Sequence, residues 1–249
     1  RITTRYNEKN FIESLMGVLH ETGHALYNLG LPEKWKYQPV GDALGTVVHE
    51  SQSLFMEMQI CRSFEFLKFA SPFMRKVFNK KGKQWEANNL YNIYTLVKPS
   101  FIRVDADEVT YPLHVIIRYK IEKDLIEGNI KVKEIPNVWN MYMNDFLNIK
   151  PKNNKEGCLQ DIHWFDGTFG YFPTYTLGAI YASQLFSKIK KELPNLNIQI
   201  ANGKFNHLIN WLRSNVHSKG SLSNSEDLVK KVTGEELNIE YFKKHLINR

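Results

Sequence analysis

Apolar residues recur at intervals of three and four along most of this chain, and runs that alternate apolar with polar residues are few. Such intervals indicate amphipathic helices, because residues three and four apart share one helix face. The pattern predicts helices over 11–29, 46–70, 84–96, 111–127, 138–147, 175–193, 203–216, 225–232 and 239–247. Gly30 and Pro72 mark the ends of the first two. Because the opening string RITTRY predicts only a short strand or extended segment, the expected fold is mainly α with very little β structure.

The length of 249 residues permits one large domain or two ordinary ones. Breaks occur at Pro99, at Gly128, at Pro136 and in the polar stretch 151–157, but none divides the chain convincingly. We therefore expect a single helical domain over 1–249. Apolar residues make up 43% and charged residues 24%, a balance that excludes disordered, collagen-like and low-complexity proteins.

The charge balance is basic, with 33 Lys and Arg against 26 Asp and Glu and a net charge of +7. Most of the excess comes from scattered lysines without a nucleic-acid-binding motif, so a solvated surface is favoured over a nucleic-acid partner. No stretch reaches the ~18 apolar residues of a membrane span, and residues 1–10 lack a signal-peptide pattern. Cys61 and Cys158 form no CxxC pair, which fits a reducing compartment. We expect a cytoplasmic protein with no membrane and no nucleic-acid partner.

The string His20-Glu21-Thr22-Gly23-His24 is an H-E-x-x-H motif inside the first predicted helix. Because a helix turns about 100° per residue, the two imidazoles lie one turn apart on one face and can point at a common ion. Glu21 lies beside them, where its carboxylate can move a proton between water and a leaving amine. Chance would produce the motif only ~0.02 times in a chain of this composition. The alternative is a pair of histidines that share a helix face by accident.

A catalytic zinc takes three protein ligands and keeps one position open for water or substrate, so a third ligand is required. The second predicted helix offers His49, Glu50 and Glu57. Glu50 stands thirty residues after His20, in the string HESQ. On its own it could equally be an ordinary exposed glutamate of a helix, and residue types alone leave all three candidates open.

HETGH followed by HESQ resembles the metallocarboxypeptidase family known as carboxypeptidase Taq, or M32. Three further strings strengthen the resemblance, because RITT at residue 1, IRVDAD at 102 and GCLQDIHW at 157 are similar to the family patterns DxRxT, IRxxAD and GxxQDxHW. The similarity extends over essentially the whole chain. It implies a C-terminal catalytic portion that lacks an N-terminal helical region, a reading that fits the first residue being Arg rather than Met. It also implies a helical zincin whose long helices flank an active-site groove, and a homodimer.

The resemblance assigns roles to the residues that match the family motifs. It implies His20, His24 and Glu50 as metal ligands and Glu21 as the general base. Arg103 of IRVDAD would bind the free terminal carboxylate of the substrate, for which its planar fork is suited. The alternative for Arg103 is an internal salt bridge with one of the acidic residues at 105, 107 and 108.

Further residues carry less specific expectations. His163, Tyr171 and Tyr175 are candidate donors to the oxyanion of the tetrahedral intermediate. Gln52 is expected to hold the ligand carboxylate or contact substrate, and Arg1 to contact substrate. Asp161 and Asp107 could orient a ligand imidazole. The remaining histidines lack ligand spacing and are expected to be structural or exposed; they are His114, His207, His217 and His245.

The function expected from these motifs is zinc-dependent hydrolysis of the C-terminal bond of peptides, with cobalt or another divalent metal as a possible replacement and one ion per chain. The substrates would be peptides with a free C-terminus. Two alternatives remain open: a helical H-E-x-x-H endopeptidase that lacks recognition of the peptide end, and a non-catalytic helical fragment that binds a partner.

Overall fold

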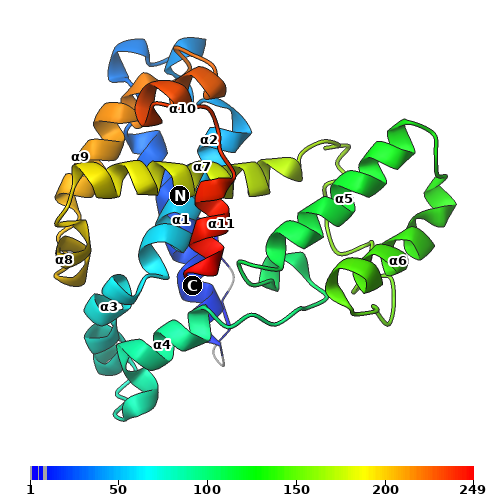
Figure 1. Cartoon of the computed structure of the whole chain (residues 1–249), viewed down its shortest axis with the longest axis horizontal. Coiled ribbons are helices and arrows are strands. Elements are labelled where there is room, and N and C mark those ends of the chain that lie inside the picture. Colours follow the sequence, from blue (N-terminus) through cyan, green and yellow to red (C-terminus); the bar gives the residue numbers. More distant parts are fainter. Residues whose placement is uncertain (1, 5, 8–9) are drawn as a thin grey trace. The chain divides into compact units, whose positions relative to one another are not determined.

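The computed structural model describes residues 2–4, 6–7 and 10–249, and helices dominate this part of the chain (Figure 1). The helices are α1 Phe11–Leu29, α2 Gly45–Leu54, α3 Phe64–Val77, α4 Ala87–Tyr94, α5 Tyr111–Ile126, α6 Ile135–Leu147, α7 Pro173–Glu192, α8 Leu196–Ala201, α9 Asn206–Asn215, α10 Ser225–Thr233 and α11 Glu240–Ile247. At the start, where a short strand or an extended segment was expected, the described residues form no strand, and one isolated bridge joins Asn7 to Asn10. The mainly α prediction is confirmed. None of the described helices has the length and apolar character needed to cross a membrane.

Contacts along the chain group into two compact units, and each is described by itself. The first unit comprises Arg1–Thr95 and Leu177–Arg249, and the second comprises Leu96–Thr176. The core of the first unit is built from α1 to α4 and from α7 to α10, with Tyr27, Phe55 and Tyr181 among its buried side chains. The second unit has its own core between α5 and α6, centred on Trp139. The expectation of a single domain stays a prediction.

The long helix expected over 46–70 is wrong in two respects. The chain forms α2, then a π-helical segment over Phe55–Cys61, and then α3. Ser63 separates the last two, because its backbone is extended and its side chain accepts a hydrogen bond from the backbone N–H of Phe66. Pro72 does not end the helix but lies inside α3. The buried side chains of α3 on either side of Pro72 account for this, since tertiary packing outweighs the local cost of proline.

Two other boundaries differ from the sequence pattern. The helix expected over 203–216 begins only at Asn206, and α8, which was not expected, precedes it. Gly203 separates the two with a φ of +69°, a left-handed conformation that suits glycine. Helix α6 begins at Ile135 and includes Pro136 in its first turn, where the missing N–H of proline costs nothing.

Candidate active site

Helices α1 and α2 bring His20, His24 and Glu50 together in the first unit. One ligand atom from each residue lies within 4.8 Å of the others. The Nε2 atom of His20 is 3.8 Å from one oxygen of Glu50, and Nε2 of His24 is 3.5 Å from the other oxygen. Two imidazole nitrogens and a carboxylate are donors that zinc accepts. Each oxygen of the buried Glu50 carboxylate faces one of these two rings, so the residues fit a bound divalent cation.

The close approach of α1 to α2 depends on a glycine of the HETGH motif. A Cβ atom on Gly23 would lie 2.4 Å from the backbone oxygen of Gln52 and 2.6 Å from Cα of Ser53. A second glycine, Gly178 of α7, lies behind Glu50, and a Cβ there would be 3.1 Å from Cγ of Glu50. Backbone packing at these two glycines therefore sets the position of Glu50 relative to the two histidines.

Glu57, one of the three candidates for the third ligand, binds His20 from the opposite side of the ring. Its Oε2 atom lies 2.8 Å from Nδ1 of His20, and its Oε1 atom forms an ion pair with Arg62. Burial opposes the charge of Glu57, but Arg62 and His20 outweigh it and lower the pKa of Glu57 to about 2. Burial likewise opposes charge on His20, whereas the hydrogen bond and charge of Glu57 raise its pKa.

The other candidate, His49, packs against the ring of His24. The two ring centroids are 4.4 Å apart with planes 23° from parallel, and Nε2 of His49 lies 3.3 Å from Oδ1 of Asn28. Burial, followed by the charge of His24, lowers the pKa of His49. His49 therefore packs against His24, and of the three candidates Glu50 has its carboxylate close to both imidazoles.

Glu21 lies next to His20 on α1 and is half-buried. Its carboxylate forms no hydrogen bond or ion pair with the described residues, which leaves its oxygens able to accept a proton. Gln52, by contrast, is fully engaged inside the first unit. It donates to Ser51 Oγ at 2.9 Å and bonds Nε2 of the buried His217 at 3.1 Å. Contact between Gln52 and substrate stays a prediction.

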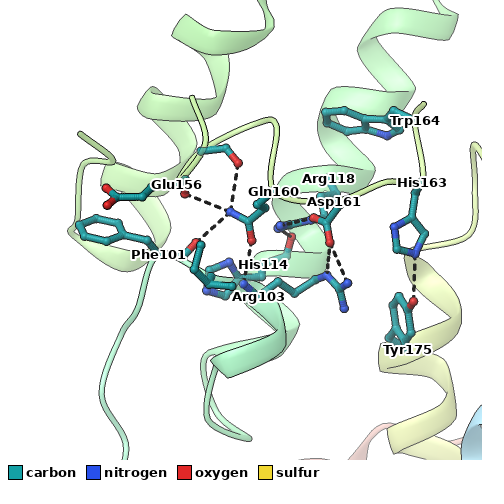
Figure 2. A network of polar contacts seen from close by, with 12 residues as sticks. Phe101, Arg103, His114, Arg118, Glu156, Gln160, Asp161, His163, Trp164 and Tyr175 are labelled. Atoms are coloured by element: carbon teal, nitrogen blue, oxygen red, sulfur yellow. Dashed lines mark hydrogen bonds and ion pairs between the residues drawn. The ribbon is translucent and has the colours of Figure 1, made fainter. Parts of the chain in front are cut away.

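Arg103 lies in the second unit, at the centre of a network of polar contacts (Figure 2). The residue as a whole is only 4% exposed. Nε and Nη2 donate to Oδ1 of Asp161 at 3.1 and 2.8 Å, and Nη1 donates to the hydroxyl of Tyr111. The backbone N–H donates to Gln160, and the ring of Tyr175 lies 4.7 Å from the guanidinium carbon. The alternative of an internal salt bridge is met in part, because Arg103 pairs with Asp161, 58 residues away, and not with one of the acidic residues at 105, 107 and 108.

Asp161 is shared by a second arginine that the sequence analysis did not single out. Arg118 of α5, with 0% exposure, donates from Nε to the other oxygen of Asp161 at 2.7 Å (Figure 2). Two buried cations thus share one carboxylate, so these three side chains carry one net positive charge, and the buried Glu122 is a further carboxylate whose charge interacts with Arg118. Burial is the largest influence on Arg118, followed by the charge of Asp161 and then that of Arg103, and the pKa of Arg118 falls to about 10.

The expected roles of Asp161 and Asp107 in orienting a ligand imidazole are wrong. Both oxygens of Asp161 are bonded to arginines. Asp107 accepts hydrogen bonds from the backbone of Lys98, Val109 and Thr110 ahead of α5. The carboxylate that forms a hydrogen bond with one of the two candidate ligand imidazoles, that of His20, belongs to Glu57.

The three expected oxyanion donors lie together in the second unit. Nε2 of His163 is 2.9 Å from the hydroxyl of Tyr175, and the rings of His163 and Tyr171 are 5.4 Å apart. Burial, followed by the charge of Arg103, lowers the pKa of His163, so its neutral form is favoured. Arg1 lies outside the described residues, and its expected contact with substrate stays a prediction.

Arg118 and Glu122 are residues that the sequence analysis missed. They occupy the same helical face as the buried Ile117 and Ile121, and Glu122 accepts a hydrogen bond from Nε1 of Trp164 at 2.8 Å. Charged residues on the apolar face of a helix are the signal that could have found them, because an ionised side chain is rarely buried without a partner.

The sequence comparisons show which known proteins this chain resembles. The family model described as "Carboxypeptidase Taq (M32) metallopeptidase" matches residues 1–249. The chain belongs to this family. Carboxypeptidase 1 of Bacillus subtilis is 41% identical over 252 residues, which cover 100% of this chain and 50% of that protein. Thermostable carboxypeptidase 1 of Thermus thermophilus is 43% identical, and the match covers 94% of this chain and 46% of that protein.

Solved structures of family members have the same fold. Trypanosoma cruzi metallocarboxypeptidase 1 matches with a TM-score of 0.95 and 43% identity, over 99% of this chain and 52% of that one. A Pyrococcus furiosus carboxypeptidase matches with a TM-score of 0.92 and 38% identity, over 99% and 49%. The chain therefore spans about half the length of the curated relatives it matches.

Proposed function

We propose that this chain is a metal-dependent carboxypeptidase that holds one divalent cation, zinc or cobalt, on His20, His24 and Glu50. The observation that carries the proposal is the convergence of these three donors within 4.8 Å, with Glu21 next to His20 on the same helix. The names of the matched relatives support the reaction class. The substrates would be peptides with a free C-terminus.

Residues of the first unit would each have a separate role in hydrolysis. A bound cation supplies Lewis-acid polarisation of the scissile carbonyl and of water. Glu21 takes the proton from the attacking water and passes it to the leaving amine, a transfer that requires a carboxylate free of other partners. Glu57 and His49 hold the ligand rings from behind, through the contacts to His20 and His24 described above.

Arg103 would bind the terminal carboxylate of the peptide. Asp161 occupies the Nε side of the guanidinium, and Tyr111 accepts from Nη1, which leaves further N–H donors of the fork for a ligand. The excess positive charge of the Arg103–Asp161–Arg118 group favours one more anion, because a buried cation without a counter-charge is costly. Recognition of the chain end is what would make the enzyme an exopeptidase.

His163, Tyr171 and Tyr175 are proposed as donors to the developing oxyanion. The hydrogen bond between Nε2 of His163 and the hydroxyl of Tyr175 holds the two groups together. When the ring nitrogen donates in this bond, the hydroxyl keeps its own proton for the oxyanion. Substrate contacts of Gln52, which stands beside Glu50, and of Arg1 belong to the same proposal. A homodimer is proposed from the family resemblance, and a cytoplasmic location from the sequence pattern and the two cysteines.

Glu21→Gln tests the reaction, with Glu13→Gln in the first turn of the same helix as the matched control. Glu21→Gln should keep its metal and lose ~10²–10⁴-fold in turnover, because only proton transfer is removed. Glu13→Gln should retain activity. Unchanged turnover in Glu21→Gln would remove Glu21 from the mechanism.

Arg103→Lys tests recognition of the peptide end. It keeps the charge but loses the fork, so kcat/KM should fall for peptides with a free C-terminus and change little for C-terminally amidated peptides, which are poor substrates throughout. Equal loss on both would indicate a structural arginine. Efficient internal cleavage of amidated peptides by the unmodified chain would favour the endopeptidase alternative.

A further inference from the structure

We infer that Glu57, held in place by Arg62, is a positioning residue that fixes the ring of His20 for metal binding. The inference rests on the proposed metal centre and assigns to it a residue outside the H-E-x-x-H and HESQ strings. It also explains why Glu57, a candidate for the third ligand, does not ligate the metal itself.

The contact with His20 determines which ring nitrogen faces the metal. An ionised carboxylate only accepts hydrogen bonds, so the 2.8 Å contact places the proton of His20 on Nδ1. Nε2 then keeps its lone pair, and this is the atom that faces Glu50 at 3.8 Å. A carboxylate behind a ligand imidazole also makes the ring a better donor and holds its orientation.

The local helix geometry explains how Glu57 reaches this position. Glu57 stands seven positions after Glu50, so the helical stretch that joins them makes somewhat less than two turns. Both carboxylates therefore lie on one face of the continuous stretch formed by α2 and the π-helical segment Phe55–Cys61. Single π-helical turns inside helices often occur at functional sites. Glu50 lies against both histidines, whereas Glu57 contacts only His20 of the two.

Arg62 determines which oxygen of Glu57 contacts His20. It pairs with Oε1, and this leaves Oε2 for His20. Both side chains of the ion pair are largely buried, so Glu57 has its compensating charge within the protein.

The two ligand histidines are therefore supported in different ways. No described residue forms a hydrogen bond with the buried Nδ1 of His24, and its ring instead stacks on His49. Loss of Glu57 should accordingly affect the orientation of His20 alone and should weaken metal binding without abolishing it.

The test measures the dissociation constant of zinc, and separately of cobalt, for the metal-free chain by competition with a chelating dye. Glu57→Gln removes the charge with almost no change in shape. Glu65→Gln is the matched control, because Glu65 in the first turn of α3 contacts Asn197 and no ligand histidine. We expect Glu57→Gln to bind metal ~10–100-fold more weakly and Glu65→Gln to bind as the unmodified chain does.

A second variant and a second measurement separate positioning from folding. Glu57→Asp keeps the charge but shortens the side chain, so it should also weaken binding. The rate of metal loss to excess chelator, measured far below the melting temperature of each metal-free variant, should rise in both Glu57 variants. Metal affinity and loss rates equal to those of the unmodified chain in a folded Glu57→Gln variant would overturn the inference and leave the metal centre intact. Absence of metal binding in the unmodified chain would instead overturn the proposed metal centre.

Discussion

Replacing Gly23 by alanine would test how closely α1 and α2 must pack to form the metal centre. The new Cβ would lie 2.4 Å from the backbone oxygen of Gln52, whereas ordinary contacts begin at 3.4 Å. The difference requires α2 to retreat by about 1 Å, since the opposing atoms belong to backbone and cannot rotate away. Metal–donor distances tolerate only about 0.2 Å, so the displacement of Glu50 should cost most of the metal affinity.

The effect of Gly23→Ala on the free energy of unfolding combines the cost of overpacking with the higher helix propensity of alanine relative to glycine. Overpacking of this kind costs about 1–3 kcal/mol, and alanine recovers up to about 1 kcal/mol relative to glycine inside a helix. Because the clash is with backbone, we expect a net loss near the upper limit, about 2 kcal/mol. For a chain of this length, that lowers the melting temperature by roughly 4–8 °C.

The matched control is Gly17→Ala on the same helix. The atom nearest to a Cβ there is Oγ1 of Thr4 at 3.2 Å, a side-chain atom that can move aside. This control should be neutral or more stable by up to about 1 kcal/mol. Thermal melting of the metal-free chains and zinc affinity provide the assay. Metal affinity in Gly23→Ala equal to that of the control would refute the argument that the crossing at Gly23 sets the ligand geometry.

Two further predictions concern the buried charges and the thiols. Asp161→Asn should destabilise the chain by about 3–5 kcal/mol at pH 7, because two buried guanidinium groups lose their shared carboxylate. Burial tends to raise the pKa of Asp161, but Arg118 and Arg103 hold this pKa below its usual range. The stabilisation of the folded chain by ionised Asp161 is therefore complete above the pKa of the unfolded chain, about 3.9, and is lost as the pH falls through the pKa of the folded chain. Urea titrations should show less loss of stability below pH 4 in the variant, and an equal loss would contradict this. Burial raises the pKa of both Cys61 and Cys158, so a thiol reagent should modify neither rapidly until the chain is unfolded; fast modification in the folded chain would contradict their burial.

The periodic parts of the fold could be predicted from sequence, and the exceptions have local causes. Helices α1 and α5 begin and end close to the expected positions, because apolar spacing and terminal glycines act within one element. The helix through Pro72 was missed because buried contacts of α3, which no local pattern reports, outweigh the effect of proline. The π-helical segment Phe55–Cys61 likewise has no signal in residue spacing.

In the candidate site, too, local spacing could be predicted from sequence, whereas contacts between distant residues could not. The spacing of His20 and His24 predicts a shared helix face, and the structure brings both to Glu50. The partner of Arg103 could not be predicted, because Asp161 is distant in sequence and the nearer acidic residues were equally plausible. For Glu57, sequence position indicated a place near the metal, but only the three-dimensional contact with Nδ1 of His20 shows which role its carboxylate can take.

Metal content and release of C-terminal residues, measured on one preparation of the chain, test the central proposal most directly. Elemental analysis should find about one zinc or cobalt ion per chain, and Glu50→Ala should lose it. A peptide with a free C-terminus should be shortened from that end, and a chelator should stop the release. A folded chain that binds no metal when zinc is supplied, or that releases residues equally well with chelator present, would contradict the account.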